Sequence, residues 1–184
     1  MCVSLSLSLS LSLSLSLSET RALTSHSTII TILLYYQQVL DAPSLQDDYY
    51  LNLLDWSSSN VLSVALGSNV YLWSPSNSKV TKLCDTGADN HVTSICWSPQ
   101  GTHLAVGTNS GTVQLWDAQG EVLVKETQTH ASRVGTMAWS SSLLATGSRD
   151  RTIMCHDARI RGSGAAADPW VIGSSRSSSS TIGG

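Results

Sequence analysis

Three glycines recur at one interval along this chain, and each is set in the same local pattern. Gly67, Gly107 and Gly147 are about 40 residues apart. A Trp-Ser pair precedes each glycine, and the tryptophans of these pairs are Trp56, Trp97 and Trp139. An apolar segment follows each glycine and ends in Leu-Trp-Ser, Leu-Trp-Asp or Cys-His-Asp, which places Trp73, Trp116 and His156 at equivalent positions. One supersecondary unit is therefore copied along the chain.

A period of about 40–45 residues that ends in Trp-Asp is typical of the WD-repeat β-propeller, in which each repeat supplies a four-stranded blade. The sequence predicts an all-β fold: an incomplete WD-repeat propeller of about three blades, with disordered ends. We place the repeats near residues 49–84, 92–126 and 134–157. Closed propellers have about 4–8 blades, so three blades would leave sheet faces and an edge exposed. Propellers are binding platforms, which points to recognition rather than chemistry.

Short apolar segments separated by turn residues predict the strands. In the first repeat we expect strands over Tyr49–Trp56, Val61–Leu66, Val70–Trp73 and Lys79–Cys84. The turns between them contain Ser, Asn and Pro, as in residues 58–60 and 74–77. The second and third repeats follow the same order.

The recurring positions have structural explanations. A glycine between the second and third strands allows a positive φ and a close approach of neighbouring blades. The third-strand tryptophan fills space between sheets and offers a buried N–H. His130 and Asp150 stand where WD repeats place a His and a turn Asp that share hydrogen bonds with a Ser or Thr and the Trp. Because His156 replaces that Trp, we expect the third network to be incomplete.

The two ends differ in composition from residues 39–161, which we predict to be the partial propeller. Residues 4–18 alternate Ser and Leu, and we expect residues 1–38 to be low-complexity, disordered or a translated leader. The apolar run Thr28–Tyr36 is too short to span a membrane. The Gly/Ser-rich residues 162–184 are expected to be a disordered tail apart from a short island at 170–172.

Charge and cysteine content limit the class of partner. The net charge of −3 argues against a general nucleic-acid binder, which would present a basic surface. The four cysteines show no CxxC spacing, which favours a reduced setting in the nucleus and cytoplasm over a disulfide framework. We expect no membrane partner and no small-molecule substrate.

The charges are unevenly distributed. Residues 39–78 hold four Asp and no Lys or Arg, whereas residues 133–161 hold five of the ten basic residues. Two solvated faces would explain this pattern. An acidic patch that receives a basic ligand is the alternative.

We find no pattern that predicts catalysis, a metal or a cofactor. The histidines have no partners at metal-ligand spacing. No G-x-S-x-G elbow and no GxxxxGK[ST] loop is present. The sequence therefore predicts a protein that is not an enzyme, with no cofactor and no metal site.

Five segments of the chain carry a family resemblance: Val39–Ser58 (VLDAPSLQDDYYLNLLDWSS), Leu104–Thr108 (LAVGT), Val113–Asp117 (VQLWD), Ser132–Gly135 (SRVG) and Gly147–Arg151 (GSRDR). Together they resemble the fizzy and fizzy-related activators of the anaphase-promoting complex. The resemblance covers residues 39 to about 161, and Leu45–Asp48 and the GSRDR motif look more like the fizzy-related branch.

The resemblance implies a substrate-recognition adaptor and activator of this ubiquitin ligase, which captures destruction-box (RxxL) and KEN degrons of cell-cycle proteins. Asp41 would pair with the destruction-box arginine, and Asp48 would receive the KEN lysine. Without such a role, Asp41 would cap the turn before Pro43 and Asp48 would shape the entry to a strand. A generic WD-repeat scaffold and an inactive activator fragment are the alternatives for the whole chain.

Overall fold

The structure, a computed structural model, describes residues 3–6, 39–43, 45–159 and 171–176, and all regular elements in these residues are β-strands. The chain forms two compact units that meet at Pro43 and Ser44, and each is described by itself. In the first unit, β1 (Val3–Ser6) pairs antiparallel with β2 (Val39–Ala42).

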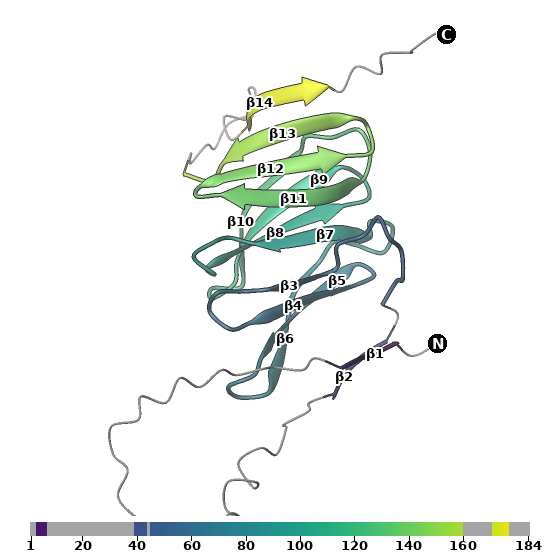
Figure 1. The fold of residues 1–184 in the computed structure, drawn as a ribbon, viewed down its shortest axis with the longest axis vertical. Coiled ribbons are helices and arrows are strands. Elements are labelled where there is room, and N and C mark those ends of the chain that lie inside the picture. The colour runs from purple at the N-terminus through teal and green to yellow at the C-terminus, as the bar shows by residue number, and fades with distance from the viewer. Residues whose placement is uncertain (1–2, 7–38, 44, 160–170, 177–184) are drawn as a thin grey trace, which may run out of the picture. The chain divides into compact units, whose positions relative to one another are not determined.

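The second unit consists of three four-stranded antiparallel sheets, which we call blades 1 to 3 in chain order (Figure 1). Blade 1 comprises β3 (Leu54–Trp56), β4 (Leu62–Leu66), β5 (Asn69–Ser74) and β6 (Lys79–Asp85). Blade 2 comprises β7 (Val92–Trp97), β8 (His103–Thr108), β9 (Thr112–Asp117) and β10 (Val122–Gln128). Blade 3 comprises β11 (Val134–Ser140), β12 (Leu143–Ser148), β13 (Thr152–Asp157) and β14 (Val171–Arg176).

The first strands of consecutive blades lie next to one another, β3 beside β7 and β7 beside β11. Hydrogen bonds join them. Asn52 forms an isolated parallel bridge with Ser94, and the Trp97 amide donates to Asp55 Oδ2 over 2.6 Å. Farther along, the hydroxyls of Thr93 and Ser94 both donate to the Val134 carbonyl over 2.7 Å. The stack is therefore fixed by polar contacts along its inner strands as well as by its core.

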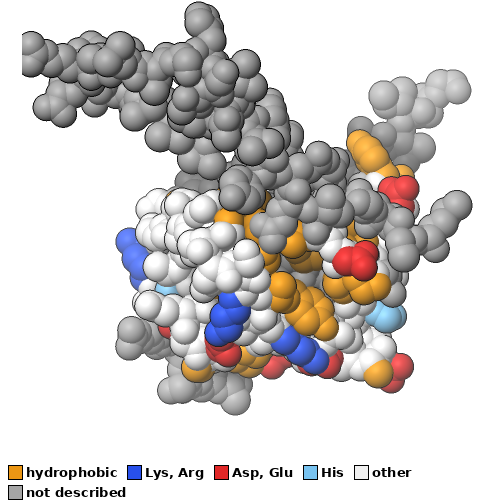
Figure 2. Space-filling view, turned by 90° about the horizontal axis from the view of Figure 1, so that it is seen from below, with side chains coloured by type: hydrophobic (Ala, Val, Ile, Leu, Met, Phe, Trp, Pro, Cys, Tyr) orange, Lys and Arg blue, Asp and Glu red, His pale blue; other side chains and the backbone are white. Residues whose placement is uncertain are grey.

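Each blade has a front face, turned toward the next blade in the chain, and a back face, turned toward the preceding one. The back face of blade 1 has no preceding blade among the described residues. Leu54 and Val80 lie on this face and are exposed. Seen from below in Figure 1, where blade 1 lies, the molecule shows hydrophobic side chains in the middle of its surface (Figure 2).

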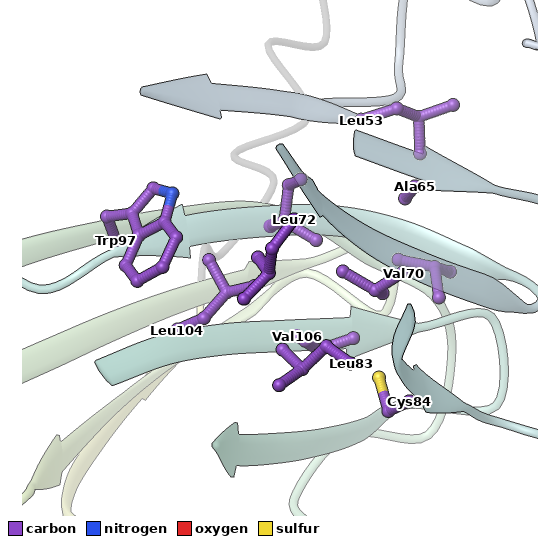
Figure 3. Packing of buried hydrophobic residues seen from close by; sticks show 11 residues of the cluster. Leu53, Ala65, Val70, Leu72, Leu83, Cys84, Trp97, Leu104 and Val106 are labelled. Carbon is purple, nitrogen blue, oxygen red and sulfur yellow. The ribbon is translucent and has the colours of Figure 1, made fainter. Parts of the chain in front are cut away.

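The core between blades 1 and 2 is the larger of two apolar clusters (Figure 3). The front face of blade 1 contributes Leu53, Ala65, Val70, Leu72, Leu83 and Cys84. The back face of blade 2 contributes Val92, Ile95, Trp97, Leu104 and Val106. Side chains alternate between the two faces of a strand, so Val70 and Leu72, Ile95 and Trp97, and Leu104 and Val106 face this core at every second position. Register shifts in the pairing of β5 with β6 and of β7 with β8 interrupt this alternation, which is why the neighbours Leu83 and Cys84 both belong to the core.

The second cluster joins blades 2 and 3 by the same rule. Ala105, Val113 and Leu115 on the front face of blade 2 pack against Val134 and Leu144 of blade 3. Met137 and Trp139 pack against this cluster and are partly buried. The two cores repeat one pattern of contacts, as the repeated sequence predicts.

The three recurring glycines are not equivalent in the structure, which corrects the prediction. Gly67 has a φ of +64° and lies in the turn between β4 and β5. Gly107 and Gly147 lie inside β8 and β12, opposite Ser94 and Thr136, and have no positive φ. Their counterpart in blade 1 is Ala65. At Gly107 the reason is close approach, because an added Cβ would lie 2.9 Å from Val134 Cβ.

Most of the segment Tyr49–Trp56, over which the sequence predicts a strand, lies outside regular strands. Only Leu54–Trp56 forms β3, and Tyr49 and Tyr50 lie in a turn. Asp48 explains the difference, because its Oδ1 accepts the Tyr50 amide over 2.9 Å and its carbonyl accepts the Leu51 amide over 3.0 Å. Asp side chains favour turns by this kind of bond to the backbone two residues ahead.

Two segments expected to lack structure contribute strands. Residues 171–176 of the predicted disordered tail form β14, which pairs with β13 and completes blade 3. Residues 3–6 of the predicted low-complexity segment form β1. Unpaired N–H and C=O groups at the edge of a sheet accept any extended segment, which explains why composition failed to predict these strands. The rest of residues 1–38 and 162–184 lies outside the described residues.

The repeat tryptophans occupy several environments. Trp73 and Trp97 are buried, whereas Trp56, Trp116 and Trp139 are half-buried. Trp56 and Trp73 meet edge to face with ring centroids 6.1 Å apart. The predicted tryptophan N–H bond forms at Trp116, whose Nε1 donates to Gln114 Oε1 over 3.0 Å.

The close approach at Gly107 gives a first prediction. Gly107→Ala forces the new methyl against Val134 and Ser94, and we expect the free energy of unfolding to fall by about 1–3 kcal/mol. Gly120→Ala is the matched control, since its nearest atom is the flexible Asp117 carboxylate at 3.3 Å. The control should stay within about 0.5 kcal/mol of wild type. Urea unfolding measures both, and equal midpoints for the two variants would contradict the packing described here.

Candidate functional site

Asp48 lies in an exposed turn immediately before blade 1. Its side chain is 41% exposed, and its Oδ2 lies 3.7 Å from Arg133 Nη1 of the loop before β11. The Asp48 carboxylate therefore already faces one cation, although a contact of this length at the surface is worth only about 0–1 kcal/mol. An incoming cation can compete for it.

Tyr50 and Arg133 link this turn to blade 3. The Arg133 guanidinium lies 5.2 Å from the centroid of the Tyr50 ring, within the range of a cation–π contact. Asn52 adds a second link, because its Nδ2 donates to the Gly135 carbonyl over 2.8 Å. The turn at residues 48–52 is thus held against β11, although Tyr49 and Tyr50 remain largely exposed to solvent.

These residues border an open hollow of about 820 Å³. Its wall is formed by the two tyrosines and Asn52 on one side and by the front face of blade 3 on the other, including Thr136, Gly147 and Ile153. Three arginines, Arg133, Arg149 and Arg151, also line it. The volume is within the range of protein ligand sites. The hollow combines aromatic surface, apolar surface and cationic groups, and one of these cations, Arg133, is the one that contacts Asp48.

Asp41, the other predicted degron contact, lies in β2 of the first unit. Its side chain is exposed, and its Cα partner across the two-stranded sheet is Ser4. Asp41 and Asp48 therefore belong to separate units.

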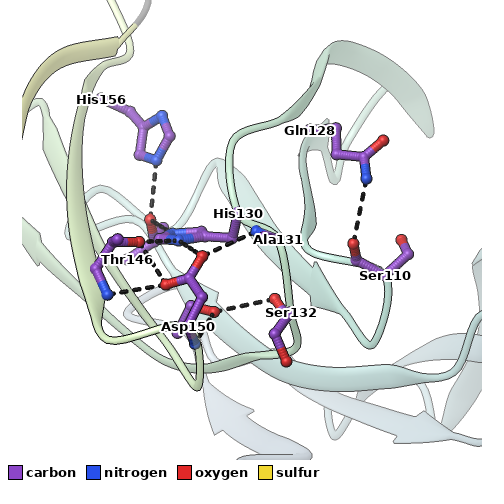
Figure 4. A network of polar contacts seen from close by, with 10 residues as sticks. Ser110, Gln128, His130, Ala131, Ser132, Thr146, Asp150 and His156 are labelled. Atoms are coloured by element: carbon purple, nitrogen blue, oxygen red, sulfur yellow. Dashed lines mark hydrogen bonds and ion pairs between the residues drawn. The ribbon is translucent and has the colours of Figure 1, made fainter.

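A buried hydrogen-bonded network lies on the back face of blade 3 (Figure 4). The His130 ring lies between two threonines, with Nε2 2.8 Å from Thr146 Oγ1 and Nδ1 2.9 Å from Thr152 Oγ1. Thr146 Oγ1 is also 2.9 Å from His156 Nε2. At the opposite end, the Thr152 hydroxyl donates to Asp150 Oδ1 over 2.5 Å. Asp150 also receives the amides of Ala131 and Thr152, both over 2.8 Å.

The carboxylate at one end determines the direction of every bond in this network. An ionised Asp150 can only accept, so Thr152 donates to it and accepts from His130 Nδ1–H. The other nitrogen of a neutral His130 then accepts the Thr146 proton, and the Thr146 oxygen accepts from His156 Nε2–H. The donors and acceptors match along the whole row, which assigns the Nδ1–H tautomer to His130.

The pKa shifts agree with this assignment. Burial lowers the pKa of His130 below its usual 6.5, and the nearby Asp150 carboxylate only partly opposes that effect. Burial alone would raise the pKa of Asp150. The hydrogen bonds from Thr152 and Ala131, together with His130, nevertheless hold it well below its ordinary value. A neutral imidazole and an ionised carboxylate therefore coexist at neutral pH.

The prediction that the third network is incomplete is wrong. His156 occupies the tryptophan position and supplies a ring N–H to Thr146, which is the bond that an indole would have supplied. The sequence could have indicated this, because imidazole and indole both carry an N–H at the edge of a planar ring. The roles of Thr146, Thr152, Tyr50 and Arg133 were not predicted, since each depends on contacts between strands or blades.

Neither a metal site nor a membrane span is found in the described part of the chain. Its residues contain no group of three or more His, Cys, Asp or Glu side chains that could hold a metal ion. They also contain no helix long and apolar enough to cross a membrane. Burial raises the pKa of the Cys84 thiol to about 12 and that of Cys96 to about 11, so both are protonated thiols at neutral pH.

The shared Thr146 hydroxyl gives a second prediction. Thr146→Val keeps the shape of the side chain but leaves His130 Nε2 and His156 Nε2 without a partner at this position, and we expect a loss of about 1–3 kcal/mol in unfolding free energy. Thr81→Val on β6 is the control, because Thr81 is half-buried and its hydroxyl makes no hydrogen bond to another residue that the structure describes. Thermal unfolding measures both variants, and an equal fall in the midpoint temperature of the two would contradict the network.

The lowered pKa of His130 gives a third prediction, on pH. The unfolded chain takes up a proton near pH 6.5 and the folded chain only at lower pH, so unfolding free energy is lost as pH falls below about 6.5. Urea unfolding at pH 7 and pH 5 should show this loss. His91 is exposed and provides the control. The variant His91→Asn should lose as much unfolding free energy between pH 7 and pH 5 as the wild type, whereas His130→Asn should lose less. If the unfolding free energy of His130→Asn fell with pH as steeply as that of the wild type, the lowered pKa of His130 would be contradicted.

Known proteins similar to this chain agree with the fold and with the sequence motifs. A family model described as the WDR19 first beta-propeller matches residues 16–161. The B-type cell cycle switch protein ccs52A of Medicago truncatula is 59% identical over 124 residues, which is 67% of this chain and 26% of that protein. Protein FIZZY-RELATED 1 of Arabidopsis thaliana is 57% identical over 124 residues, again 67% and 26% of the two chains.

A more distant relative and a solved structure extend this agreement. The anaphase-promoting complex subunit cdc20 of Dictyostelium discoideum is 48% identical over 126 residues, 68% of this chain and 25% of that protein. A chain in the crystal structure of the mitotic checkpoint complex has a TM-score of 0.69 and 40% identity, and the match covers 74% of this chain and 41% of that one. This chain thus spans about a quarter of the length of these curated relatives. It belongs to the WD-repeat β-propeller proteins and, among them, to the fizzy and fizzy-related family, with the fizzy-related branch as the best fit.

Proposed function

We propose that the chain is part of a substrate-recognition adaptor and activator of the anaphase-promoting complex ubiquitin ligase. In this proposal it binds destruction-box and KEN degrons of cell-cycle proteins, in the nucleus and cytoplasm, and performs no catalysis itself. The observation that carries the proposal is the 59% identity to a cell cycle switch protein over 124 residues of this chain.

The surroundings of Asp48 support a role in binding a lysine. The carboxylate is exposed, its Oδ1 accepts the Tyr50 amide, and its Oδ2 has only a long contact with Arg133, which lines the hollow. A lysine ammonium can approach Asp48 Oδ2 from solvent, and the exposed Tyr49 and Tyr50 rings offer apolar surface to its stem. Arg133 then acts as a competitor for the same carboxylate.

The surroundings of Asp41 support a role in binding an arginine. Its carboxylate is exposed on a strand, so both oxygens are open to a guanidinium, which can bind a carboxylate with two parallel hydrogen bonds. A bidentate pair of this kind fits an arginine better than a lysine.

Binding of two labelled peptides to the full chain tests the proposal, with fluorescence anisotropy as the readout. One peptide carries RxxL and the other KEN, and scrambled versions serve as controls. We expect Asp41→Asn to weaken the binding of the RxxL peptide by about ten-fold, in line with the loss of a charge-assisted hydrogen bond. Asp48→Asn should weaken the KEN peptide by a smaller factor of about three to five, because its carboxylate is half-exposed.

Arg133 provides a variant with the opposite sign. Arg133→Gln removes the cation that competes for Asp48, so we expect tighter binding of the KEN peptide and unchanged binding of the RxxL peptide. Equal binding of native and scrambled peptides would overturn the proposal in favour of a generic WD-repeat scaffold. No binding of either peptide by a folded chain would favour an inactive fragment of an activator.

A further inference from the structure

The turn that carries Asp48 is joined to blades 2 and 3 at Asn52. The Asn52 amide donates to the Thr93 carbonyl over 3.0 Å, and the Asn52 carbonyl accepts the Ile95 amide over 2.9 Å. Both of these backbone bonds run to β7 of blade 2. The Asn52 side chain reaches a different blade, because its Nδ2 donates to the Gly135 carbonyl of β11 over 2.8 Å. Asn52 therefore links the turn to two blades at once.

The partner of this side chain determines which residue types can do the same. A backbone carbonyl only accepts hydrogen bonds, so the Asn52 atom that faces Gly135 must be the amide nitrogen. Aspartate would place a second acceptor against the carbonyl, and leucine has a similar length but no donor. The two backbones are also close here, since a Cβ added to Gly135 would lie 3.6 Å from the Tyr50 carbonyl oxygen.

The bonds inside the turn fix its shape but not its position. Asp48 accepts the amides of Tyr50 and Leu51, and both bonds stay within the turn. Arg133 makes two long contacts with the turn, 3.7 Å to Asp48 Oδ2 and 5.2 Å to the centroid of the Tyr50 ring. Contacts of this kind at a surface are weak. The bond from Asn52 is shorter and directional, so it holds the turn at one distance from β11.

The position of Asp48 affects its affinity for a lysine. If a carboxylate moves relative to the surface around it, a ligand must immobilise the carboxylate on binding, and this ordering lowers the affinity. A carboxylate that is already held in place avoids that cost. Arg133 lies two residues before Gly135, so the bond from Asn52 also fixes the distance between Asp48 and the cation that competes for it.

We propose that Asn52 is a positioning residue for the lysine site at Asp48. Its bond to the Gly135 carbonyl presents Asp48 at a fixed place beside Arg133, and Asn52 itself does not contact the lysine. The role rests on the proposed function, because it concerns the same KEN lysine. Asn52 acts through a strand that lies 83 positions later in the chain, so only the folded stack creates this role.

Binding of the labelled KEN peptide to the full chain tests the role of Asn52. Asn52→Leu removes the donor, keeps a similar length and adds no charge. We expect it to weaken the binding of the KEN peptide by about two- to three-fold, in line with the loss of one neutral hydrogen bond. Binding of the RxxL peptide should not change, because Asp41 belongs to the other unit.

Asn109→Leu is the matched control. Asn109 is exposed in the turn between β8 and β9, and its side chain makes no hydrogen bond to another residue that the structure describes. This variant should bind both peptides like the wild type. Far-UV circular dichroism verifies that each variant is folded.

A double variant separates positioning from a general structural effect. Because Asn52 acts through Asp48, Asn52→Leu should weaken the binding of the KEN peptide no further once Asp48→Asn is present. A general structural effect would instead lower the affinity by the same factor in both backgrounds, and that result would overturn the proposal. Wild-type affinity for the KEN peptide in a folded Asn52→Leu would overturn it as well.

Amide hydrogen exchange gives a readout that needs no peptide. The amides of Tyr50 and Leu51 are bonded within the turn, and both should exchange faster in Asn52→Leu because the turn opens more often. Unchanged exchange at both amides would overturn the positioning role. Failure of the proposed function is recognised separately, because the wild type would then bind native and scrambled KEN peptides equally.

Discussion

The contact of one blade with the next is the constraint on which the rest of this structure depends. A single four-stranded sheet has two faces and cannot bury both by itself, so each blade is stable only against its neighbours. In the contact, the front face combines small residues such as Ala65 with larger ones such as Leu72, and the back face contributes large apolar residues such as Leu104 and Trp97. Hydrogen bonds along the inner strands fix the offset between blades, because the Val134 carbonyl accepts two hydroxyls from the preceding blade.

The sequence predicted the repeat, the all-β class and the order of strands, because these depend on local alternation and on turn residues. It did not predict which glycines are equivalent. Gly67 matches Gly107 in spacing, whereas the pairing of strands makes Ala65 the true counterpart. It also missed β14, since a serine-rich segment pairs through its backbone and needs no special side chains. Register and edge pairing are properties of the sheet, and spacing along one chain specifies them only in part.

The candidate site was predicted to a similar degree. Asp48 was predicted to receive a lysine or, without that role, to shape the entry to a strand, and the structure places it at the turn before β3. Its partner Arg133 comes from a loop 85 positions later, so only the folded stack brings the two charges together. The same holds in blade 3, where Thr146 serves two histidines. The members of a polar network that crosses strands can be named only when the strand register is known. For this reason the sequence did not predict that His156 replaces the tryptophan as the hydrogen-bond donor to Thr146.

The chemistry of blade 3 has a consequence for how the molecule opens. Where the first two blades have Leu72 and Leu115, blade 3 has Cys155, and where they have Val64 and Val106 it has Thr146. His156 in place of tryptophan removes further apolar area from the same sheet. Blade 3 therefore relies on directional hydrogen bonds more than on apolar burial, and its exposed front face adds no burial to compensate. Opening of blade 3 away from blade 2 therefore exposes a smaller apolar cluster than separation of blades 1 and 2 would.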